Sequence, residues 1–525
     1  MKLNLASIER KDEWKGFQLP AFDIGAVREK TYREPVWLHF GAGNIFRAFP
    51  AVLLQKLLDK GLCDRGVIVA EGFDYDIIDR AYAPYDNLSL LAVLKSDGSV
   101  EKQVTASVTE SLKASPDFEE DWERLNEIFR APSLQMVSFT ITEKGYGVSP
   151  ADLERGLSPV LIMGRVTVLL LERFLAGGHP LTLQSMDNCS HNGDKVRSAV
   201  LSYADRWVRD GLAPEAFAGW LRDGSKITFP WSMIDKITPR PDARVQRMLE
   251  EAGFEDSRTI VTEKHTYTAP FVNTEETEYL VIEDSYTNGR LPLEEAGVIY
   301  TDRDTVDRVE RMKVTTCLNP LHTAMSIFGC LLGYTLISEE MRDGDLRGLV
   351  TKLGYLEGMP VVTDPGVLDP SEFIDAVLTK RLPNPFMPDS PQRIAMDTSQ
   401  KLSIRFGETI RSYLKKGLNT KVLVLIPLVL AAYARYLKGI DDRGAAFEIS
   451  PDPMLAELQE IAAPLKIGAC HQDLSCLRNL YSREDIFGLD LYQAGLGERI
   501  EGMVSELFAG EGAVRAVLHK YVSQR

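Results

Sequence analysis

Hydrophobic positions in the first part of the chain predict strands and helices in alternation. Residues 36–40 form a short apolar run that predicts a buried strand, and it leads directly into a glycine-containing segment at 41–47. Apolar residues then recur at helical spacing over 49–58, and a second strand-like run at 67–70 ends in Glu71. The order of strand, glycine turn, helix, strand and acid is typical of a dinucleotide-binding unit.

Two later β-rich runs predict further strands of the same sheet. Residues 136–142 end in Glu143, and residues 181–186 are followed within two positions by Asn188. In a parallel sheet the loops after the carboxyl ends of the strands line the ligand crevice, so Gly41, Glu143 and Asn188 are expected at one edge. An asparagine after a strand is also a common turn residue.

The remaining pattern defines the fold class. Two β-rich runs between Leu88 and Val108 flank Asp97-Gly98, which predicts a hairpin and an antiparallel extension or small insert. From about residue 305 onward helical patterns dominate, at 322–335, 341–353, 371–380, 404–416, 421–437, 453–465 and 495–522. We therefore expect an α/β protein with an N-terminal Rossmann-like domain at 1–300 and a mainly α-helical C-terminal domain at 301–525.

The glycine turn carries the candidate cofactor site. Gly41 would allow a tight turn, and Gly43 would let a pyrophosphate approach the backbone at the helix N-terminus. Glu71 is placed to accept hydrogen bonds from a ribose 2′-hydroxyl and to repel a 2′-phosphate, which favours NAD over NADP; Asp74 is a second candidate for this contact. The candidate cofactor-binding residues are Gly41, Gly43, Asn44, Ile45, Phe46, Arg47, Glu71 and Glu143.

The segment 310–322 gathers residues with catalytic chemistry. Asn319-Pro320 predicts a helix start with Asn319 as N-cap, and His322 then lies on the same side of the first turn. Lys313 lies upstream, where a positive helix N-terminus would lower its pKa toward that of a working base. A capped helix with a solvated lysine explains the same pattern without any function.

A polar and basic cluster follows at 393–401, from Arg393 to Lys401. It is interpreted equally well as a solvated helix face with a capping Asp-Thr-Ser or as a set of donors for a polyhydroxylated or carboxylated ligand. For a substrate carboxylate, Arg393, Lys401 and Arg405 are all plausible partners.

Composition narrows the class of partner. The chain has 525 residues, 44% of them hydrophobic, and a formal net charge of −16. The acidic balance argues against nucleic acid as a partner, because no basic excess exists to displace counterions from phosphates. It does not exclude a small anionic substrate, which is held by local charges.

The cysteines and the apolar runs predict a cytoplasmic protein without a metal site. The N-terminus lacks the apolar core of a signal peptide, and the longest apolar run, 422–434, is too short to span a bilayer. The six cysteines are scattered, which is typical of reduced thiols in a cytoplasmic protein. Cys470-His471 with Cys476 matches no structural zinc spacing, so no metal site is predicted.

Several ordered motifs together resemble one family, the polyol-specific long-chain dehydrogenases, also called the mannitol dehydrogenase family. The resemblance covers most of the chain. It is carried by residues 39–47, 142–146, 185–188 with 192–193, 229–239, 281–284, 313–322 and 393–401.

The resemblance implies zinc-independent hydride transfer between NAD and a secondary alcohol of a linear sugar derivative. Carried over residue by residue, it assigns the base to Lys313, the oxygen-polarising pair to Asn188 and Asn319, and a proton relay to Glu310. It assigns substrate orientation to His322, Arg393 and Lys401, and an active-site acid to Asp235. Within this family, the residues of these motifs look most like those of the fructuronate reductase (D-mannonate oxidoreductase) branch.

One departure from the family pattern concerns Lys313. The family usually places four residues between the lysine and the asparagine, whereas this chain has five, Val314 to Leu318. Either a local bulge restores Lys313 to its place or the position of the base differs slightly.

Alternatives to this function remain within and outside the enzyme class. Within it they are mannitol 2-dehydrogenase and tagaturonate reductase; outside it, a catalytically inactive NAD-binding sensor or scaffold. The expected partners are a small sugar-acid or polyol substrate, without nucleic acid or membrane, and the protein is expected to be a monomer or homodimer.

Overall fold

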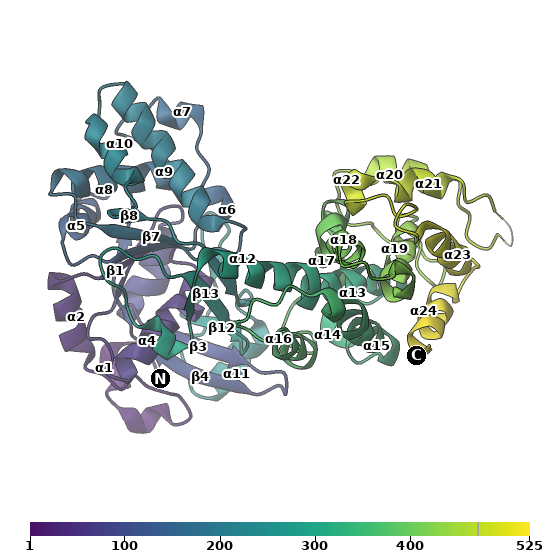
Figure 1. Cartoon of the computed structure of the whole chain (residues 1–525). Coiled ribbons are helices and arrows are strands. Elements are labelled where there is room, and N and C mark those ends of the chain that lie inside the picture. Colours follow the sequence, from purple (N-terminus) through teal and green to yellow (C-terminus); the bar gives the residue numbers. More distant parts are fainter. Residues whose placement is uncertain (470–471, 525) are drawn as a thin grey trace. The chain divides into compact units, whose positions relative to one another are not determined.

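The computed structural model describes residues 1–469 and 472–524 (Figure 1). The chain divides into two compact units, of which unit 1 comprises Met1–Lys95 and Ser99–Asp307 and unit 2 comprises Ser96–Gly98 and Arg308–Arg525. The division falls within helix α12 (Arg303–Met312). Cys470 and His471, two residues of the sequence pattern considered for zinc, lie outside the described residues.

Unit 1 is built on a six-stranded parallel sheet with the order β5-β2-β1-β6-β7-β8. The strands are β1 (Trp37–Phe40), β2 (Val67–Glu71), β5 (Val108–Lys113), β6 (Met136–Phe139), β7 (Leu181–Ser185) and β8 (Ile227–Thr228). The strand order reverses direction between β1 and β6, and in doubly wound sheets the dinucleotide binds at such a switch point. The Rossmann-like N-terminal domain expected from the sequence is confirmed.

Both faces of this sheet are covered, which explains why its strands read as almost continuous apolar runs. Leu38 and Phe40 contribute to a core with α5 (Glu119–Arg130), α8 (Ile162–Leu175) and α9 (Asn192–Arg209). Trp37, one position away and therefore on the opposite face, packs into a second core with α4 (Pro50–Asp59). Figure 1 shows α8 and α9 on one side of the sheet and α4 on the other.

Smaller sheets complete unit 1. β3 (Ser89–Leu94) and β4 (Val100–Thr105) pair antiparallel around Asp97-Gly98, so the predicted hairpin is confirmed. β12 (Phe271–Glu275) adds to β3 in parallel, a pairing that the sequence did not reveal because its partners are far apart along the chain. A third sheet joins β9 (Ser232–Asp235), β13 (Tyr279–Glu283) and β14 (Ile299–Thr301).

Unit 2 is mainly helical, as predicted. Its helices include α13 (Asn319–Leu332), α15 (Gly344–Lys352), α16 (Pro370–Ala376), α18 (Glu408–Lys415), α19 (Leu425–Tyr436) and α20 (Leu455–Ala462). Every residue of α19 is buried. The prediction of one helix over 495–522 was wrong: α23 (Gly497–Leu507) and α24 (Ala513–Ser523) are separate, because Gly510 and Gly512 adopt positive φ between them.

Over the described residues, none of the helices combines the length and the apolar character that crossing a membrane requires.

Candidate active site

The turn after β1 has a backbone that only glycine fits. Gly41 has a φ of +107°, and a Cβ atom added there would lie 2.2 Å from the carbonyl oxygen of Thr140. The chain then enters the short helix α3 (Asn44–Ala48). The N–H groups of Asn44 and Ile45 donate to no acceptor within residues 1–469 and 472–524, as is usual in a first helical turn.

Replacing Gly41 by alanine is expected to lower the stability of unit 1 by about 2–4 kcal/mol, because the methyl group meets backbone rather than a flexible side chain. Gly43→Ala is the matched control. Gly43 has a φ of −75°, and no atom lies within 4 Å of its added Cβ. That variant should melt like the parent protein and lose only NADH affinity. Thermal melts and NADH fluorescence titration measure both effects, and a Gly41→Ala variant of unchanged stability would contradict this account.

Glu71, the predicted ribose ligand, is buried beneath this turn. Its Oε2 accepts the N–H of Ala42 at 2.8 Å, and its Oε1 accepts those of Phe73 at 2.8 Å and Asp74 at 3.1 Å. Burial raises the pKa of Glu71, while these N–H donors favour the charged form. The carboxylate therefore connects the end of β2 to the glycine turn, a role that the sequence pattern did not reveal.

Asp74, the alternative ribose ligand, is also buried, and its Oδ2 accepts a hydrogen bond from the hydroxyl of Thr262 at 2.6 Å. Phe73 between the two acids is 67% exposed, and the ammonium group of Lys264 lies 4.1 Å from its ring centroid. The end of β2 thus presents an exposed aromatic ring with a cation beside it.

The side chains of α3 mainly hold the turn in place. Arg47 is buried and donates to the carbonyl oxygen of Ala269 at 2.6 Å, to Thr268 Oγ1 at 2.8 Å and to Asn44 Oδ1 at 2.9 Å. Phe46 is completely buried and stacks on His39 with ring centroids 4.2 Å apart. These contacts leave the α3 backbone and Ile45 as the groups that face open space.

Asn188 and Ile45 line the same cavity. It has a volume of about 190 Å³, and its other lining residues are Met186, Asp187, Ile234, Lys236 and Thr238. The turn after β1, the loop after β7 and the end of β9 therefore meet here. Asp235 is buried and is not among the lining residues, since it alternates along the strand with Ile234 and Lys236.

Lys236 is a lining residue that the sequence analysis missed. Its side chain is 3% exposed, and its ammonium group lies 2.6 Å from Glu278, which also binds Lys56 at 2.6 Å. Burial lowers the pKa of Lys236, and the carboxylate of Glu278 opposes this effect. Its position next to Asp235 in the 229–239 motif was the available signal.

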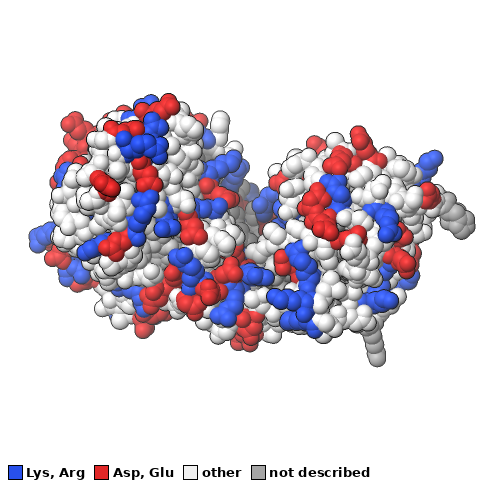
Figure 2. Space-filling view, turned by 45° about the horizontal axis from the view of Figure 1, so that its top comes forward, with Lys and Arg blue, Asp and Glu red and all other residues white. Residues whose placement is uncertain are grey.

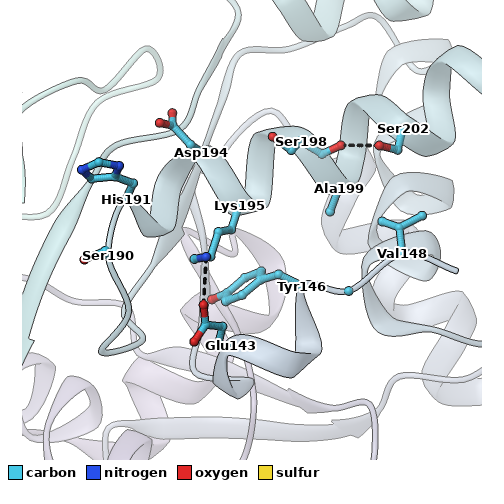
Figure 3. A pocket seen from close by; sticks show the side chains of 11 residues that line it. Glu143, Tyr146, Val148, Ser190, His191, Asp194, Lys195, Ser198, Ala199 and Ser202 are labelled. Carbon is cyan, nitrogen blue, oxygen red and sulfur yellow. Dashed lines mark hydrogen bonds and ion pairs between the residues drawn. The ribbon is translucent and has the colours of Figure 1, made fainter. Parts of the chain in front are cut away.

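Glu143 lies in the short helix α6 (Thr142–Gly145), because β6 ends at Phe139 rather than at residue 142 as predicted, and it borders a larger cavity of about 590 Å³ (Figure 3). Its carboxylate forms an ion pair with Lys195 of α9 at 2.9 Å, and serines 190, 198 and 202 also line the cavity. Asp187 holds the neighbouring loop: it accepts the N–H groups of Ile141 at 2.9 Å and Thr142 at 3.0 Å. Gly41, Glu143 and Asn188 all follow the carboxyl ends of adjacent strands, β1, β6 and β7.

In unit 2 the segment from Lys313 to Cys317 is a π-helical turn, η5. The N–H of Leu318 donates to the carbonyl oxygen of Lys313 at 3.1 Å, five residues back. A π-turn accommodates one more residue than an α-helical turn. The stretch between Lys313 and Asn319 therefore contains a local bulge, the feature on which the first of the two alternatives depends.

The surroundings of this bulge differ in one detail from the prediction. Asn319 is the first residue of α13 rather than its N-cap, which is Leu318, and no side chain caps this helix. The side-chain amide of Asn319 has no hydrogen-bond partner in the described parts of unit 2, so it remains available to a ligand. Lys313 is 3% exposed, and Glu310 precedes it by three residues on α12, so the two lie on one helix face.

His322 is neutral at physiological pH. Its pKa is lowered to about 4, chiefly by burial and further by Arg405, Arg381 and Arg393, with Asp389 acting in the opposite direction. A neutral imidazole can donate one hydrogen bond and accept another, which suits the orientation of a hydroxyl-bearing ligand.

The two predicted substrate-binding cations of unit 2 both have partners. Arg393 forms an ion pair with Asp389 one helical turn earlier. The ammonium of Lys401 donates to the carbonyl oxygens of Met396 and, at 3.3 Å, Ile394. Burial and the nearby Arg405 lower the pKa of Lys401. Arg381 and Asp389, which influence His322, were missed because nothing in their local sequence marks them.

Acidic and basic side chains are interspersed on the face of the molecule seen in Figure 2. Among the residues that the structure describes, no three His, Cys, Asp or Glu side chains are grouped in a way that could hold a metal ion.

Comparison with known proteins agrees with this architecture. The mannitol dehydrogenase Rossmann domain matches residues 36–295, and the mannitol dehydrogenase C-terminal domain matches residues 305–507. The D-mannonate oxidoreductase of Thermotoga maritima is 48% identical over 540 residues, covering 100% of this chain and 99% of the relative.

Two solved structures share the fold. A substrate-free D-sorbitol dehydrogenase aligns with a TM-score of 0.81 at 24% identity, over 99% of this chain and 100% of its own. The mannitol 2-dehydrogenase of Pseudomonas fluorescens, in a ternary complex with NAD and D-mannitol, aligns with a TM-score of 0.70 at 25% identity, over 100% of both chains. The chain therefore belongs to the mannitol dehydrogenase family, and it is an oxidoreductase of the CH–OH dehydrogenase type.

Proposed function

We propose that this protein interconverts fructuronate and D-mannonate with NAD(H) as the hydride carrier. The observation that carries the proposal is the 48% identity to a D-mannonate oxidoreductase over the full length of both chains. The electrostatics of unit 2 support it, because three arginines act on His322 and a single acid, Asp389, opposes them. A local excess of positive charge suits a sugar acid better than an uncharged polyol.

The proposed roles follow from side-chain chemistry and position. Lys313, buried at the π-turn, exchanges the proton with the substrate oxygen, and Glu310 relays it to solvent. Asn188 and Asn319 donate amide hydrogens to that oxygen as negative charge develops on it. His322, Arg393 and Lys401 orient the substrate. Asp235, at the end of β9, is proposed as the active-site acid that the family resemblance implies.

The glycine turn fits a dinucleotide. The close backbone approach at Gly41, the unpaired N–H groups of Asn44 and Ile45, and the open space beside Gly43 are what a pyrophosphate requires. Bound NADH would supply the hydride. We favour NAD over NADP because a carboxylate, Glu71, lies at the end of β2, where Oε2 has a single N–H donor and can still accept a ribose hydroxyl.

One observation favours NADP as a second possibility. The ammonium of Lys264 lies against the ring of Phe73, two residues after Glu71, and a cation there could offset the charge of a 2′-phosphate. KM values for NADH and NADPH, measured for the parent enzyme and for Lys264→Met, distinguish NAD use from NADP use. Only an enzyme that uses NADP should lose cofactor affinity in the variant.

Reduction of fructose to mannitol is the runner-up function, because Arg393 and Lys401 suit an uncharged polyol equally well. Reduction of tagaturonate is a third. An inactive NAD-binding sensor is disfavoured, since Lys313, both asparagines and His322 are all present. We also propose a cytoplasmic location, consistent with the free thiols of the described cysteines, and a monomer or homodimer.

The test is NADH oxidation by the purified protein, followed by absorbance, with fructuronate, tagaturonate and fructose measured side by side. Rapid oxidation with fructuronate and little with the others is the expected result. A preference for fructose would reassign the protein to mannitol dehydrogenation, and NADH binding without oxidation in any of the three would support the sensor.

A further inference from the structure

Arg405 lies at the junction of the two segments that carry the candidate catalytic residues of unit 2. It belongs to the π-helical turn η10 (Ser403–Gly407), which packs against both η5, the segment of Lys313, and α13. Its Nη1 donates to the hydroxyl of Thr323, and that hydroxyl donates to the carbonyl oxygen of Asn319 at 3.1 Å. The guanidinium is thus held one hydrogen-bonded step from the first turn of α13.

The guanidinium of Arg405 makes few hydrogen bonds for a side chain that is partly buried. Within the described chain its one hydrogen bond is to Thr323, and no carboxylate pairs with it. Partial burial lowers the pKa of Arg405 to about 10, and no acid opposes that effect, so it is a partly desolvated cation at neutral pH. A partly desolvated charge without a counterion is costly, and a bound anion would offset that cost.

A structural arginine of the same chain shows the contrast. Arg173 in unit 1 is completely buried, and its guanidinium donates to five carbonyl oxygens, those of Phe129, Ala131, Leu134, His179 and Pro180. That arrangement uses all the donors of the side chain. Arg405 is half-buried instead, and its unused donors are not sealed from solvent.

The other two candidates for a substrate carboxylate are already engaged. Arg393 is paired with Asp389, and Lys401 donates to two backbone carbonyl groups. Of these three cations, only Arg405 lacks both an acid and a carbonyl partner among the described residues.

We propose that Arg405 binds the carboxylate of the sugar-acid substrate and thereby sets the preference for a hexuronate over an uncharged ketose. This inference rests on the proposed function and specifies one determinant of it. A guanidinium matches a carboxylate with two parallel N–H···O bonds, whereas Lys401 would offer only a point charge. The hydroxyl of Thr323 fixes the orientation of the guanidinium.

The experiment compares Arg405→Met, Arg405→Lys and a control, Arg411→Met, with the parent enzyme. Arg411 lies on the following helix and pairs with Glu408 and the carbonyl oxygen of Gly488, away from this hydrogen-bonded chain. Two quantities are measured: kcat/KM for fructuronate and for fructose, and the affinity of the NAD-loaded enzyme for D-mannonate and for D-mannitol by calorimetry.

We expect Arg405→Met to lower kcat/KM for fructuronate and the affinity for D-mannonate about 100-fold, mainly through KM, while fructose and D-mannitol change less than about threefold. Arg405→Lys should recover part of the loss, and Arg411→Met should change neither preference. Thermal melts of each variant identify any that fail to fold.

An equal loss for charged and uncharged ligands, or no loss for either, would overturn the role of Arg405. A parent enzyme that binds D-mannonate but does not oxidise NADH with fructuronate would overturn the proposed function alone, because the effect of Arg405→Met on D-mannonate affinity can still be measured. A parent enzyme that binds neither D-mannonate nor fructuronate would overturn both.

Discussion

Replacing Lys313 by methionine is expected to lower kcat by about 10³-fold while NADH affinity stays within a factor of about two, since general acid–base catalysis contributes roughly 10²–10⁴-fold. Methionine keeps the length and apolar stem of the side chain, which is 3% exposed, but removes the exchangeable proton. The loss should therefore appear in kcat rather than in the melting temperature. Stopped-flow NADH oxidation and NADH titration measure the two quantities.

The control is Lys352→Met, a lysine of α15 whose ammonium donates to the backbone carbonyls of Val522 and Gln524. It should leave kcat unchanged. Added small amines should restore part of the activity of Lys313→Met if the missing group is a proton donor. Turnover within about tenfold of the parent enzyme would remove Lys313 from the mechanism and leave the base unassigned.

The second large effect is expected for Asn319→Ala, which should lower kcat about 10²–10³-fold through the loss of one donor to the developing oxyanion. The structure makes this a clean substitution. Asn319 is the first residue of α13, caps nothing, and has no side-chain partner in the described part of unit 2, so alanine should not destabilise the helix. The melting temperature should stay the same or rise slightly.

Asn419→Ala is the converse control. Its side chain accepts the N–H of Lys421 and caps a short helical turn, so its loss should lower stability by about 1 kcal/mol without changing kcat. The interpretation of Asn319 would fail if its variant lost stability and activity together, since the residue would then be structural.

The π-turn at Lys313 bears on both of these experiments. π-bulges are rare and are concentrated at functional sites. Here the bulge occupies the residues between the candidate base and the candidate oxyanion donor, where the chain carries one residue more than the family pattern. Four such turns occur among the described residues of unit 2: η5, η6 (Leu353–Gly358), η8 (Val377–Arg381) and η10. Two of them, η5 and η10, pack against each other and carry Lys313 and Arg405.

The amino-acid sequence by itself determined the features that depend on neighbouring residues. The apolar run before Gly41, the helical spacing after it and the acid after the second strand were enough to predict the dinucleotide-binding unit. The Asp97-Gly98 hairpin and the helical character of unit 2 were equally readable. In each case periodicity reports burial within one segment, so no distant contact is needed.

Only the tertiary structure decided which groups meet. Sequence position suggested a ribose contact for Glu71, and only the folded turn shows that its carboxylate also binds three backbone N–H groups. Arg393, Lys401 and Arg405 were indistinguishable as carboxylate partners until their own partners were known. The π-turn that holds the extra residue after Lys313 and the pairing of β12 with β3 were also visible only in the folded structure. Hydrogen bonds and ion pairs of this kind join residues far apart in the chain, and local spacing carries no record of them.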